Sequence, residues 1–365
     1  MIEGTRLLDI ARLRLINQQL AGTTLRTAQE MTAWLGAVQG QEYAQSKWAL
    51  GLRLPHLRDS DIEAAFAAGQ VLRTHILRPT WHLVAAGDIR WLLSLSGPRV
   101  DAVNAHRYRQ LDLDAHILAR CNDIIADVLQ GGGQLDRKEI GNELVARGIS
   151  TEGQRLSHIL MYAELNGVIC SGPRRGKRFT YMLLDERVPP AAPVTRDEAL
   201  AKLAERYFIS RGPAGVRGFS NWSGLTMADC RRGLEMVRDR LIEESVNGDR
   251  LYRASDATLA EGRRFEDIYL LPVYDELLMS YRDRSVFMQY SPRAGMPAEW
   301  RYDSAIVYDG QIIGTWRRLV RPKGIDMEYD FFVPPNERQR FAFKRAVERF
   351  KDFVGLDVND LTGAI

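Results

Sequence analysis

The order of elements expected in residues 113–188 restricts the fold of this chain more than any other feature. Three amphipathic runs suit helices, and each follows a residue that can cap a helix, such as Asp114, Asp136 or Thr151. Two short β-rich runs then form a hairpin. Three helices followed by a hairpin predict a winged helix. The expected helices cover residues 114–129, 137–147 and 152–166, and the expected strands cover 168–170 and 179–184.

The turn of that hairpin is strongly basic. It contains Arg174, Arg175, Lys177 and Arg178 within five residues. Basic side chains on such a turn commonly contact phosphates, so we expect these four to bind DNA. The alternative is a solvated turn whose charge serves solubility.

A similar order of elements recurs on both sides of this unit, without repetition of the sequence itself. After the proline-rich linker 188–193, we expect a third winged helix in residues 193–257 and a hairpin that turns at Asn247-Gly248. A less regular copy, with an additional helix at 5–20, occupies residues 1–112. Its expected helices are 27–38, 42–51 and 59–68, and its expected strands are 71–77 and 80–84.

From residue 258 to residue 365 the pattern changes to short β-rich runs and a closing helix near 336–353. Strands are expected at 268–274, 287–290, 304–308, 312–320 and 327–333. A small β-barrel or a curved sheet fits these runs. The predicted fold class is therefore mainly α with β: tandem winged-helix (helix-turn-helix) domains and a C-terminal β-barrel.

Composition excludes several classes of protein. No run approaches the length of a membrane span, and Met1-Ile2-Glu3-Gly4 does not resemble a signal peptide, so a cytoplasmic location is expected. The three cysteines and six histidines show no metal-ligand spacing, and no phosphate loop is present, so neither a metal nor a cofactor is expected. Net charge is only +3, but 43 of the 50 basic residues are arginine. Arginine suits phosphate binding, and a GC-rich genome would give the same bias.

Several ordered strings resemble the winged-helix DNA glycosylase family, which has an azinomycin-resistance branch and a crosslink-unhooking branch. Each string is weak alone, but together they span nearly the whole chain. The strings are Val38-Gln39-Gly40-Gln41, Trp48-Ala49-Leu50-Gly51-Leu52-Arg53, Arg78-Pro79-Thr80-Trp81-His82-Leu83-Val84, Gly212-Pro213, Asn221-Trp222-Ser223-Gly224-Leu225, Leu271-Pro272-Val273-Tyr274-Asp275, Tyr281-Arg282-Asp283-Arg284 and Ile313-Gly314-Thr315-Trp316-Arg317.

The resemblance implies that Gln39 and Gln41 are catalytic, because a Gln-x-Gln pair in that family holds the attacking water. Gly40 departs from the apolar residue of the azinomycin-resistance branch and raises the question of the backbone angle there. Gln41 argues against the crosslink-unhooking branch, which has Gln-x-Asp. The resemblance also implies a channel for DNA between the winged helices and the barrel.

Two amides can serve this chemistry because an N7-alkylated purine is already a cationic leaving group. The remaining task is to orient a water molecule near C1′, and glutamine carbonyls accept hydrogen bonds without a tuned pKa. The alternative is that Gln39 and Gln41 are ordinary polar residues at a helix end.

Several other residues are candidates for a functional role. Asp275, at a strand end, could support the cationic sugar or form a structural ion pair with an arginine such as Arg284. His82 could contact a phosphate or be a buried, satisfied histidine. Arg53, Arg73, Arg78 and Arg284 could line the DNA channel or be surface charges, and Trp316 could face DNA or the core.

The sequence and the resemblance together predict a monofunctional DNA glycosylase. It would act, likewise by the resemblance, on N7-alkylated and bulky or crosslinked purines in double-stranded DNA, as a monomer. A non-enzymatic winged-helix DNA-binding protein, either a regulator or an architectural factor, is the main alternative. A protein-interaction module is the third. The pair Gln39 and Gln41 would be irrelevant to both alternatives.

Overall fold

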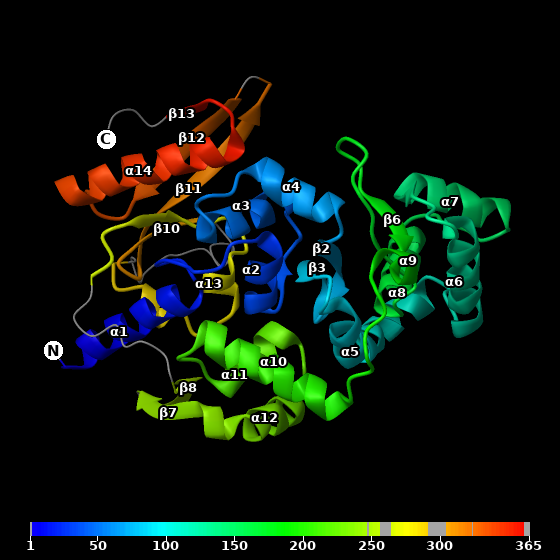
Figure 1. Ribbon diagram of the computed structural model, residues 1–365, viewed down its shortest axis with the longest axis horizontal. Coiled ribbons are helices and arrows are strands. Elements are labelled where there is room, and N and C mark those ends of the chain that lie inside the picture. Colours follow the sequence, from blue (N-terminus) through cyan, green and yellow to red (C-terminus); the bar gives the residue numbers. More distant parts are fainter. Residues whose placement is uncertain (1, 247, 256–263, 291–303, 323, 361–365) are drawn as a thin grey trace.

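The computed structural model describes residues 2–246, 248–255, 264–290, 304–322 and 324–360, and it shows a mixed α/β fold (Figure 1). The N-terminal part places α2, α3 and α4 beside a small antiparallel sheet in the order β1-β3-β2. These elements are α1 (Ile2–Asn17), α2 (Ala28–Leu35), β1 (Val38–Gln39), α3 (Tyr43–Arg53), α4 (Asp59–Ala67), β2 (Val71–Ile76) and β3 (Arg78–Ala85).

A long helix, α5 (Ile89–Gln110), leads from the first part to the second and was not expected from the sequence. The second part then follows the predicted order of helices and hairpin, with an additional short strand. Its elements are α6 (Ala115–Leu129), β4 (Leu135–Asp136), α7 (Arg137–Ala146), α8 (Arg155–Leu165), β5 (Ile169–Ser171), β6 (Thr180–Leu183) and α9 (Leu184–Arg187).

Local capping explains two of the helix starts in this second part. Asp114 and Asp136 cap α6 and α7 through their side chains, as predicted. Thr151 does not cap α8, which begins later, after Gln154. The sheet order is β4-β6-β5, and this part has a hydrophobic cluster of its own, which includes Ile125 and Leu144.

The third part contains three helices and one antiparallel hairpin. Thr195 and Thr226 cap its first and third helices, and Asn247 of the predicted turn lies outside the described residues. The elements are α10 (Arg196–Arg211), α11 (Val216–Ser223), α12 (Met227–Met236), the 3-10 helix η1 (Arg238–Arg240), β7 (Leu241–Val246) and β8 (Asp249–Ala254).

The C-terminal part is an open, curled sheet, so of the two expected forms the structure shows the curved sheet and not the β-barrel of the predicted fold class. Its order is β13-β12-β11-β10-β9, so β13 and β9 are edges. The run at 287–290, expected to be a strand, instead begins with the last residue of a 3-10 helix, and none of its residues pairs in the sheet. The elements are β9 (Ile268–Leu270), α13 (Glu276–Met279), η2 (Ser285–Phe287), β10 (Ala305–Tyr308), β11 (Gln311–Arg321), β12 (Gly324–Phe331), α14 (Glu337–Val354) and β13 (Val358–Asp360).

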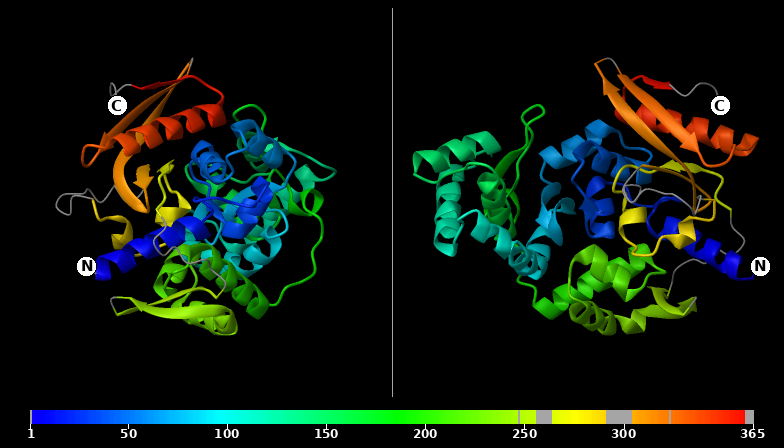
Figure 2. Two further views of the ribbon diagram at one scale, coloured as in Figure 1. Left: turned by 60° about the vertical axis from the view of Figure 1, so that its left-hand side comes forward. Right: turned by 180° about the vertical axis from the view of Figure 1, so that it is seen from behind.

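Figures 1 and 2 show α6 to α9 at one end of the molecule and the two termini toward the other end. One large hydrophobic cluster joins the N-terminal, third and C-terminal parts. No helix among the described residues is long and apolar enough to cross a membrane. The continuous core fixes β1 relative to α13 and α11, which is what positions the glutamine pair.

Candidate active site

Gln39 lies in strand β1, where it pairs with His82 of β3. Helix α2 ends at Leu35 because Gly36 adopts a positive φ of 73°, which favours glycine. The prediction of a helix to residue 38 is therefore wrong at its end. Gln39 therefore lies in the short strand β1, and Gln41 lies just after it, so the pair is not at the end of α2.

The backbone and the side chain of Gln39 are both fixed. Its N–H donates to Glu276 Oε1 at 2.9 Å, and its Nε2 donates to Thr80 Oγ1 at 3.5 Å. Its Oε1 accepts a hydrogen bond of 3.2 Å from the backbone N–H of Gln41. Gln39 is only 7% exposed, and one lone pair of its amide oxygen is already used.

Gln41 differs from Gln39 because its side chain is exposed, just before helix α3. Within the described residues, no hydrogen bond holds its carboxamide. The two amides therefore have unequal environments. Gln39 is a fixed group that holds the Gln41 backbone, and Gln41 offers a free carbonyl oxygen to solvent.

Gly40 suits a close approach to β3 and does not have an unusual backbone angle. It is absent from the glycines with positive φ, so its backbone suits other residues. A Cβ at this position would lie 3.1 to 3.2 Å from backbone atoms of His82 and Leu83. Gly40 N–H donates to Trp81 O at 2.8 Å, and Gly40 O accepts from Arg73 Nε at 2.9 Å.

Glu276 is a buried carboxylate directly behind Gln39, and the sequence interpretation missed it. Its Oε2 accepts hydrogen bonds from Arg211 Nη2 at 2.8 Å and from Trp222 Nε1 at 2.9 Å. Glu276 and Arg211 are both 0% exposed. This network joins α10, α11 and α13 to β1, so the position of Gln39 depends on three distant segments.

Asp275 and Arg53 form a second buried ion pair next to the first. The guanidinium of Arg53 binds the Asp275 carboxylate through two hydrogen bonds of 2.8 and 2.9 Å, and both side chains are 0% exposed. Asp275 also caps α13. Of the two predicted roles for Asp275 the structure shows the ion pair, with Arg53 as the partner instead of Arg284.

Burial contradicts the functional alternatives for these two residues. Arg53 donates its remaining N–H groups to Gln18 O, Gln18 Oε1 and Ala49 O, so it presents nothing to a DNA channel. Asp275 is closed off from any sugar by the same contacts. Because both side chains are 0% exposed, the structure supports neither the predicted DNA contact of Arg53 nor a direct contact of Asp275 with the sugar.

His82 is also buried, with an exposed fraction of 0%. Burial, and next the positive charge of Arg78, lower the pKa of His82 well below its usual value. A neutral ring with its proton on Nδ1 satisfies both contacts, since Nδ1 lies 3.0 Å from Thr80 O and Nε2 lies 3.3 Å from Arg78 Nη2. The structure therefore supports the satisfied histidine and not a phosphate contact.

Arg73 is a nearly buried connector and does not line a surface. Its guanidinium lies 4.1 Å from the ring centroid of Trp81 and 4.5 Å from that of Phe179. Burial lowers the pKa of Arg73, and the residue is 8% exposed. The predicted DNA contact of Arg73 is wrong, because this cation instead ties Gly40 to the basic hairpin.

The basic turn 172–179 is largely neutralised by carboxylates of the chain itself. Arg178 pairs with Asp136 at 2.6 Å, Arg174 pairs with Glu63 of α4 at 3.3 Å, and Arg175 pairs with Glu139. Lys177 is exposed and has no ion pair within the described ranges. Of the four predicted contacts, Lys177 is the cation that is immediately free for a phosphate.

The three remaining candidates differ in exposure. Arg78 and Arg284 are half-buried. Trp316 is 3% exposed, donates from Nε1 to Leu271 O at 2.8 Å and packs on Phe350 of α14. The prediction that Trp316 contacts DNA is therefore wrong, and its role in the core is shown.

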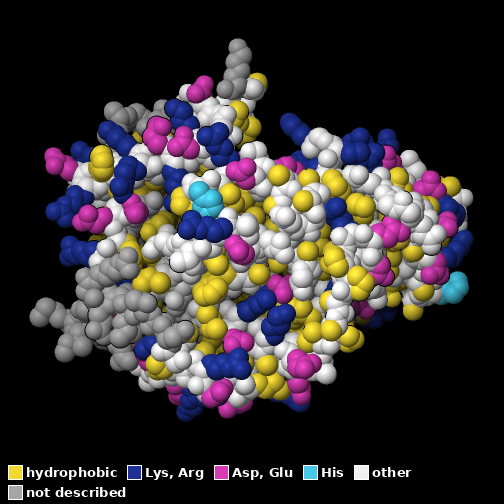
Figure 3. Space-filling view, viewed as in Figure 1, with side chains coloured by type: hydrophobic (Ala, Val, Ile, Leu, Met, Phe, Trp, Pro, Cys, Tyr) yellow, Lys and Arg dark blue, Asp and Glu magenta, His cyan; other side chains and the backbone are white. Residues whose placement is uncertain are grey.

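The start of α3, which follows Gln41, lies between two projecting hairpins. On one side, Arg174 and Phe179 contact Tyr43. On the other side, Arg318 of β11 interacts electrostatically with Glu42. Figure 3 shows a hollow in the upper outline of the molecule, between the end of the β11–β12 hairpin and the turn 172–179, with α4 at its base.

Gln39 and Gln41 are thus brought together with Thr80 and Glu276, whereas Arg53, Asp275, His82 and Arg73 are structural. A signal for Glu276 was present, because it follows Asp275 directly at the end of an apolar strand. Arg211 gave no such signal. No group of three or more His, Cys, Asp or Glu side chains in the described part of the chain could hold a metal ion.

Comparison with known proteins gives one consistent result. Residues 32–353 match a family model described as "DNA glycosylase AlkZ-like". The chain is 24% identical over 323 residues to the "Interstrand DNA cross-link repair glycosylase" of Streptomyces sahachiroi, covering 83% of this chain and 85% of that protein. It is also similar to the solved structure "Streptomyces sahachiroi DNA glycosylase AlkZ", with a TM-score of 0.77, 20% identity and coverage of 97% of this chain and 99% of that chain.

Proposed function

The chain belongs to the AlkZ-like DNA glycosylase family, and from this premise we propose that it hydrolyses the N-glycosidic bond of N7-alkylated purines in double-stranded DNA. The curated relative is named for interstrand crosslink repair. We extend the proposal to bulky and crosslinked purine adducts on that ground. The product on DNA is an abasic site.

We propose that a water molecule bound by Gln41 and Gln39 is the nucleophile. The water oxygen bonds to C1′, the electrons of the C1′–N9 bond move to the cationic purine and neutralise it, and the water loses one proton to solvent. The purine leaves as a neutral base, so the step needs no strong acid. What the protein supplies is orientation and a favourable environment for the cationic sugar.

The observation that carries this proposal is that hydrogen bonds hold the Gln39 side chain, whereas within the described residues none holds the Gln41 carboxamide. The Gln39 oxygen is held by the Gln41 N–H, and the Gln39 backbone is held by buried Glu276. The Gln41 carboxamide remains free and exposed at the start of α3. A fixed acceptor beside a free acceptor suits the positioning of one water.

The proposed reaction is monofunctional, without a covalent intermediate. Lys47, on α3, is engaged by Asp59 at 2.6 Å and by Glu63 at 2.8 Å. An amine held by two carboxylates is a poor candidate for a Schiff base with an abasic sugar.

We also propose that the second and third parts are winged helices and that the duplex lies in the hollow of Figure 3. The sheet order β4-β6-β5 and the hairpin β7–β8, each with its preceding helices, support this assignment. Lys177, at the side of the hollow, would then meet a phosphate.

The test is single-turnover release of N7-methylguanine from duplex DNA by the wild type, Gln39→Ala, Gln41→Ala and the double variant. We expect each single substitution to slow release by about 100-fold. DNA affinity should stay within about threefold. Gln70→Ala, an exposed glutamine of the same part of the chain, is the control and should be unaffected.

Two outcomes would overturn the catalytic proposal. Release at the wild-type rate by the double variant would show that the amides do not position water. Tight DNA binding by the wild type without release of any modified base would favour the non-enzymatic DNA-binding protein.

A further inference from the structure

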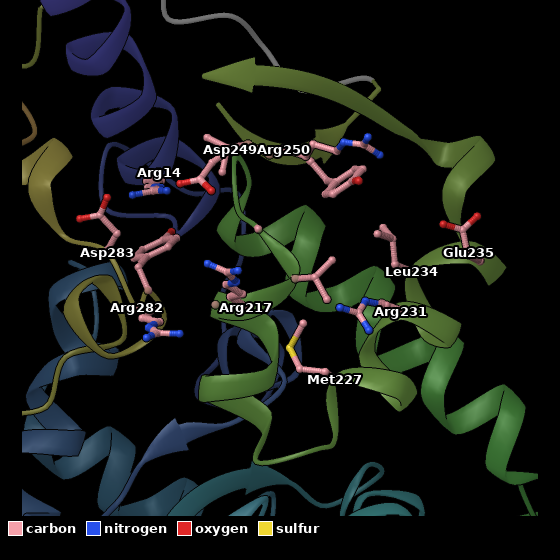
Figure 4. Close-up of a pocket in the computed structure, with 16 residues that line it drawn as sticks. Arg14, Arg217, Met227, Arg231, Leu234, Glu235, Asp249, Arg250, Arg282 and Asp283 are labelled. Carbon is pink, nitrogen blue, oxygen red and sulfur yellow. The ribbon is translucent and has the colours of Figure 1, made fainter. Parts of the chain in front are cut away.

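A cavity of about 730 Å³ lies away from the glutamine pair, between α1, α11, α12, β8 and residues 281–283 (Figure 4). None of its lining residues belongs to the candidate active site. The charged side chains of its lining have an excess of positive charge. The arginines are Arg14, Arg217, Arg231, Arg250 and Arg282, against the carboxylates Glu235, Asp249 and Asp283.

Arg14 places a buried cation in the wall of this cavity. It is 4% exposed, and its Nε and Nη2 donate to Pro213 O at 3.0 and 2.9 Å. Its guanidinium lies 3.8 Å from the ring centroid of Tyr281. Its Nη1 is buried and has no hydrogen-bond partner in the described part of the chain. A buried N–H group without an acceptor is costly and marks a place for an anionic oxygen.

Three of the exposed arginines of the cavity are unpaired, whereas Arg250 lies 3.6 Å from Glu243. Arg217, Arg231 and Arg282 form no ion pair or hydrogen bond within the described residues. In Figure 4, Arg231 and Arg282 lie on opposite sides of Arg217. Neighbouring arginines of the third part behave differently, since Arg196 pairs with Asp229 and Arg232 pairs with Asp197. Within the described residues of the third part, the arginines that lack an ion pair are Arg217 and Arg231, and both line the cavity.

We infer that this cavity is a second phosphate-binding site, which holds the DNA backbone through Arg217, Arg231 and Arg282. The three side chains come from α11, α12 and the segment 281–283, so they can meet separate phosphates. Helix α12 also leads toward the hairpin β7–β8, as α8 leads into β5–β6. The buried charge of Arg14 adds to the positive potential from behind. The inference rests on the proposed function only in taking DNA as the substrate.

The test compares two triple variants that lose the same charge. One is R217Q/R231Q/R282Q, and the control is R196Q/R232Q/R240Q, in which each arginine is paired in the wild type. Fluorescence anisotropy measures the affinity for an undamaged duplex of about 25 base pairs at several salt concentrations between about 50 and 200 mM. Arg14 is left unchanged because it is buried.

We expect the cavity variant to lower the slope of log affinity against log salt by about three, or about one for each phosphate that is no longer bound. The control variant should lower it by less than one. The rate of base release at saturating enzyme should stay within about twofold, because the cavity does not touch the glutamine pair.

Equal slopes for the two variants, or a wild-type slope for the cavity variant, would overturn the inference. A cavity variant that keeps its DNA slope but loses binding of inorganic pyrophosphate would assign the cavity to a free phosphate ligand, which also overturns it. A wild type that releases no base, with a cavity variant that still loses slope, would refute the proposed function and leave the cavity assignment standing.

Discussion

At the scale of single residues, the proposed function of the two neutral amides depends on the charged groups that hold Gln39. Gln39 is uncharged, and Glu276 holds its backbone in place. The Glu276 carboxylate accepts hydrogen bonds from the Gln39 backbone, from Arg211 and from Trp222. A carboxylate accepts three donors at once, and an amide in its place does not. Glu276 is therefore a positioning residue for Gln39.

We predict that Glu276→Gln slows base release about tenfold and lowers the free energy of unfolding by about 3 kcal/mol. The new NH₂ group would face the donors of Arg211 and Trp222, and breaking one side of a buried ion pair typically costs about 3–5 kcal/mol. Urea denaturation and single-turnover release measure the two effects, and DNA affinity should change little.

Glu266→Gln is the matched control, because Glu266 is exposed and pairs with Arg338 at 3.2 Å. Its free energy of unfolding should change by less than about 0.5 kcal/mol. If Glu276→Gln behaves like this control in both measurements, Glu276 does not position Gln39.

At the scale of elements, local signals predicted more of the fold than long-range ones. Asp114, Asp136 and Thr226 cap helices where expected, because a capping hydrogen bond spans only three residues. Helix α5 escaped prediction because Gly97-Pro98 lies inside it and normally breaks a helix. Packing overrides that signal, since a Cβ at Gly97 would lie 2.8 Å from Leu165 O of α8.

The candidate site was less accessible to prediction than the helices. The glutamine pair was found through the resemblance, since spacing alone does not distinguish it from surface polar residues. Arg53 and Asp275 are 222 positions apart, and no local pattern shows that each neutralises the other in the core. Long-range pairing is the reason that several expected DNA contacts proved structural.

Helix α3, which begins two residues after Gln41, packs against α14, and Gly51 lies at the contact with Phe353. A Cβ at Gly51 would penetrate the ring of Phe353, and Trp48 packs against Phe350 and Phe353 of the same helix. We predict that Gly51→Ala lowers the free energy of unfolding by about 1–2 kcal/mol. Overpacking costs about 1–3 kcal/mol and outweighs the gain of about 1 kcal/mol from replacing a helical glycine.

Gly87→Ala introduces the same methyl group where nothing lies within 4 Å. Thermal unfolding of the two variants should show a lower midpoint for Gly51→Ala and almost no change for Gly87→Ala. Equal midpoints would mean that α14 shifts without cost to accommodate the methyl group, and that the contact between Gly51 and Phe353 is not tightly packed.

At the scale of the whole molecule, pairing decides how much positive charge is available to DNA. The chain has 50 basic and 47 acidic residues, and many of its arginines are bound to its own carboxylates. A count of arginines therefore overstates the DNA-binding surface. Among the described residues, the cations without an ion pair include Lys177 beside the hollow of Figure 3 and three arginines at the cavity of Figure 4.

This uneven pairing predicts different salt effects for two neighbouring residues of the basic turn. Lys177→Gln should lower the slope of log DNA affinity against log salt by about one, because a free ammonium neutralises one phosphate. Arg178→Gln should lower it by less than half as much. Arg178 must first leave Asp136, which caps α7, and its binding to phosphate would uncover that carboxylate beside the DNA. Anisotropy titrations of both variants over a series of salt concentrations measure the slopes. A larger effect at Arg178 than at Lys177 would show that DNA displaces Asp136 from Arg178. Paired arginines would then also contribute to DNA binding, and the total number of basic residues would be the better measure of the available charge.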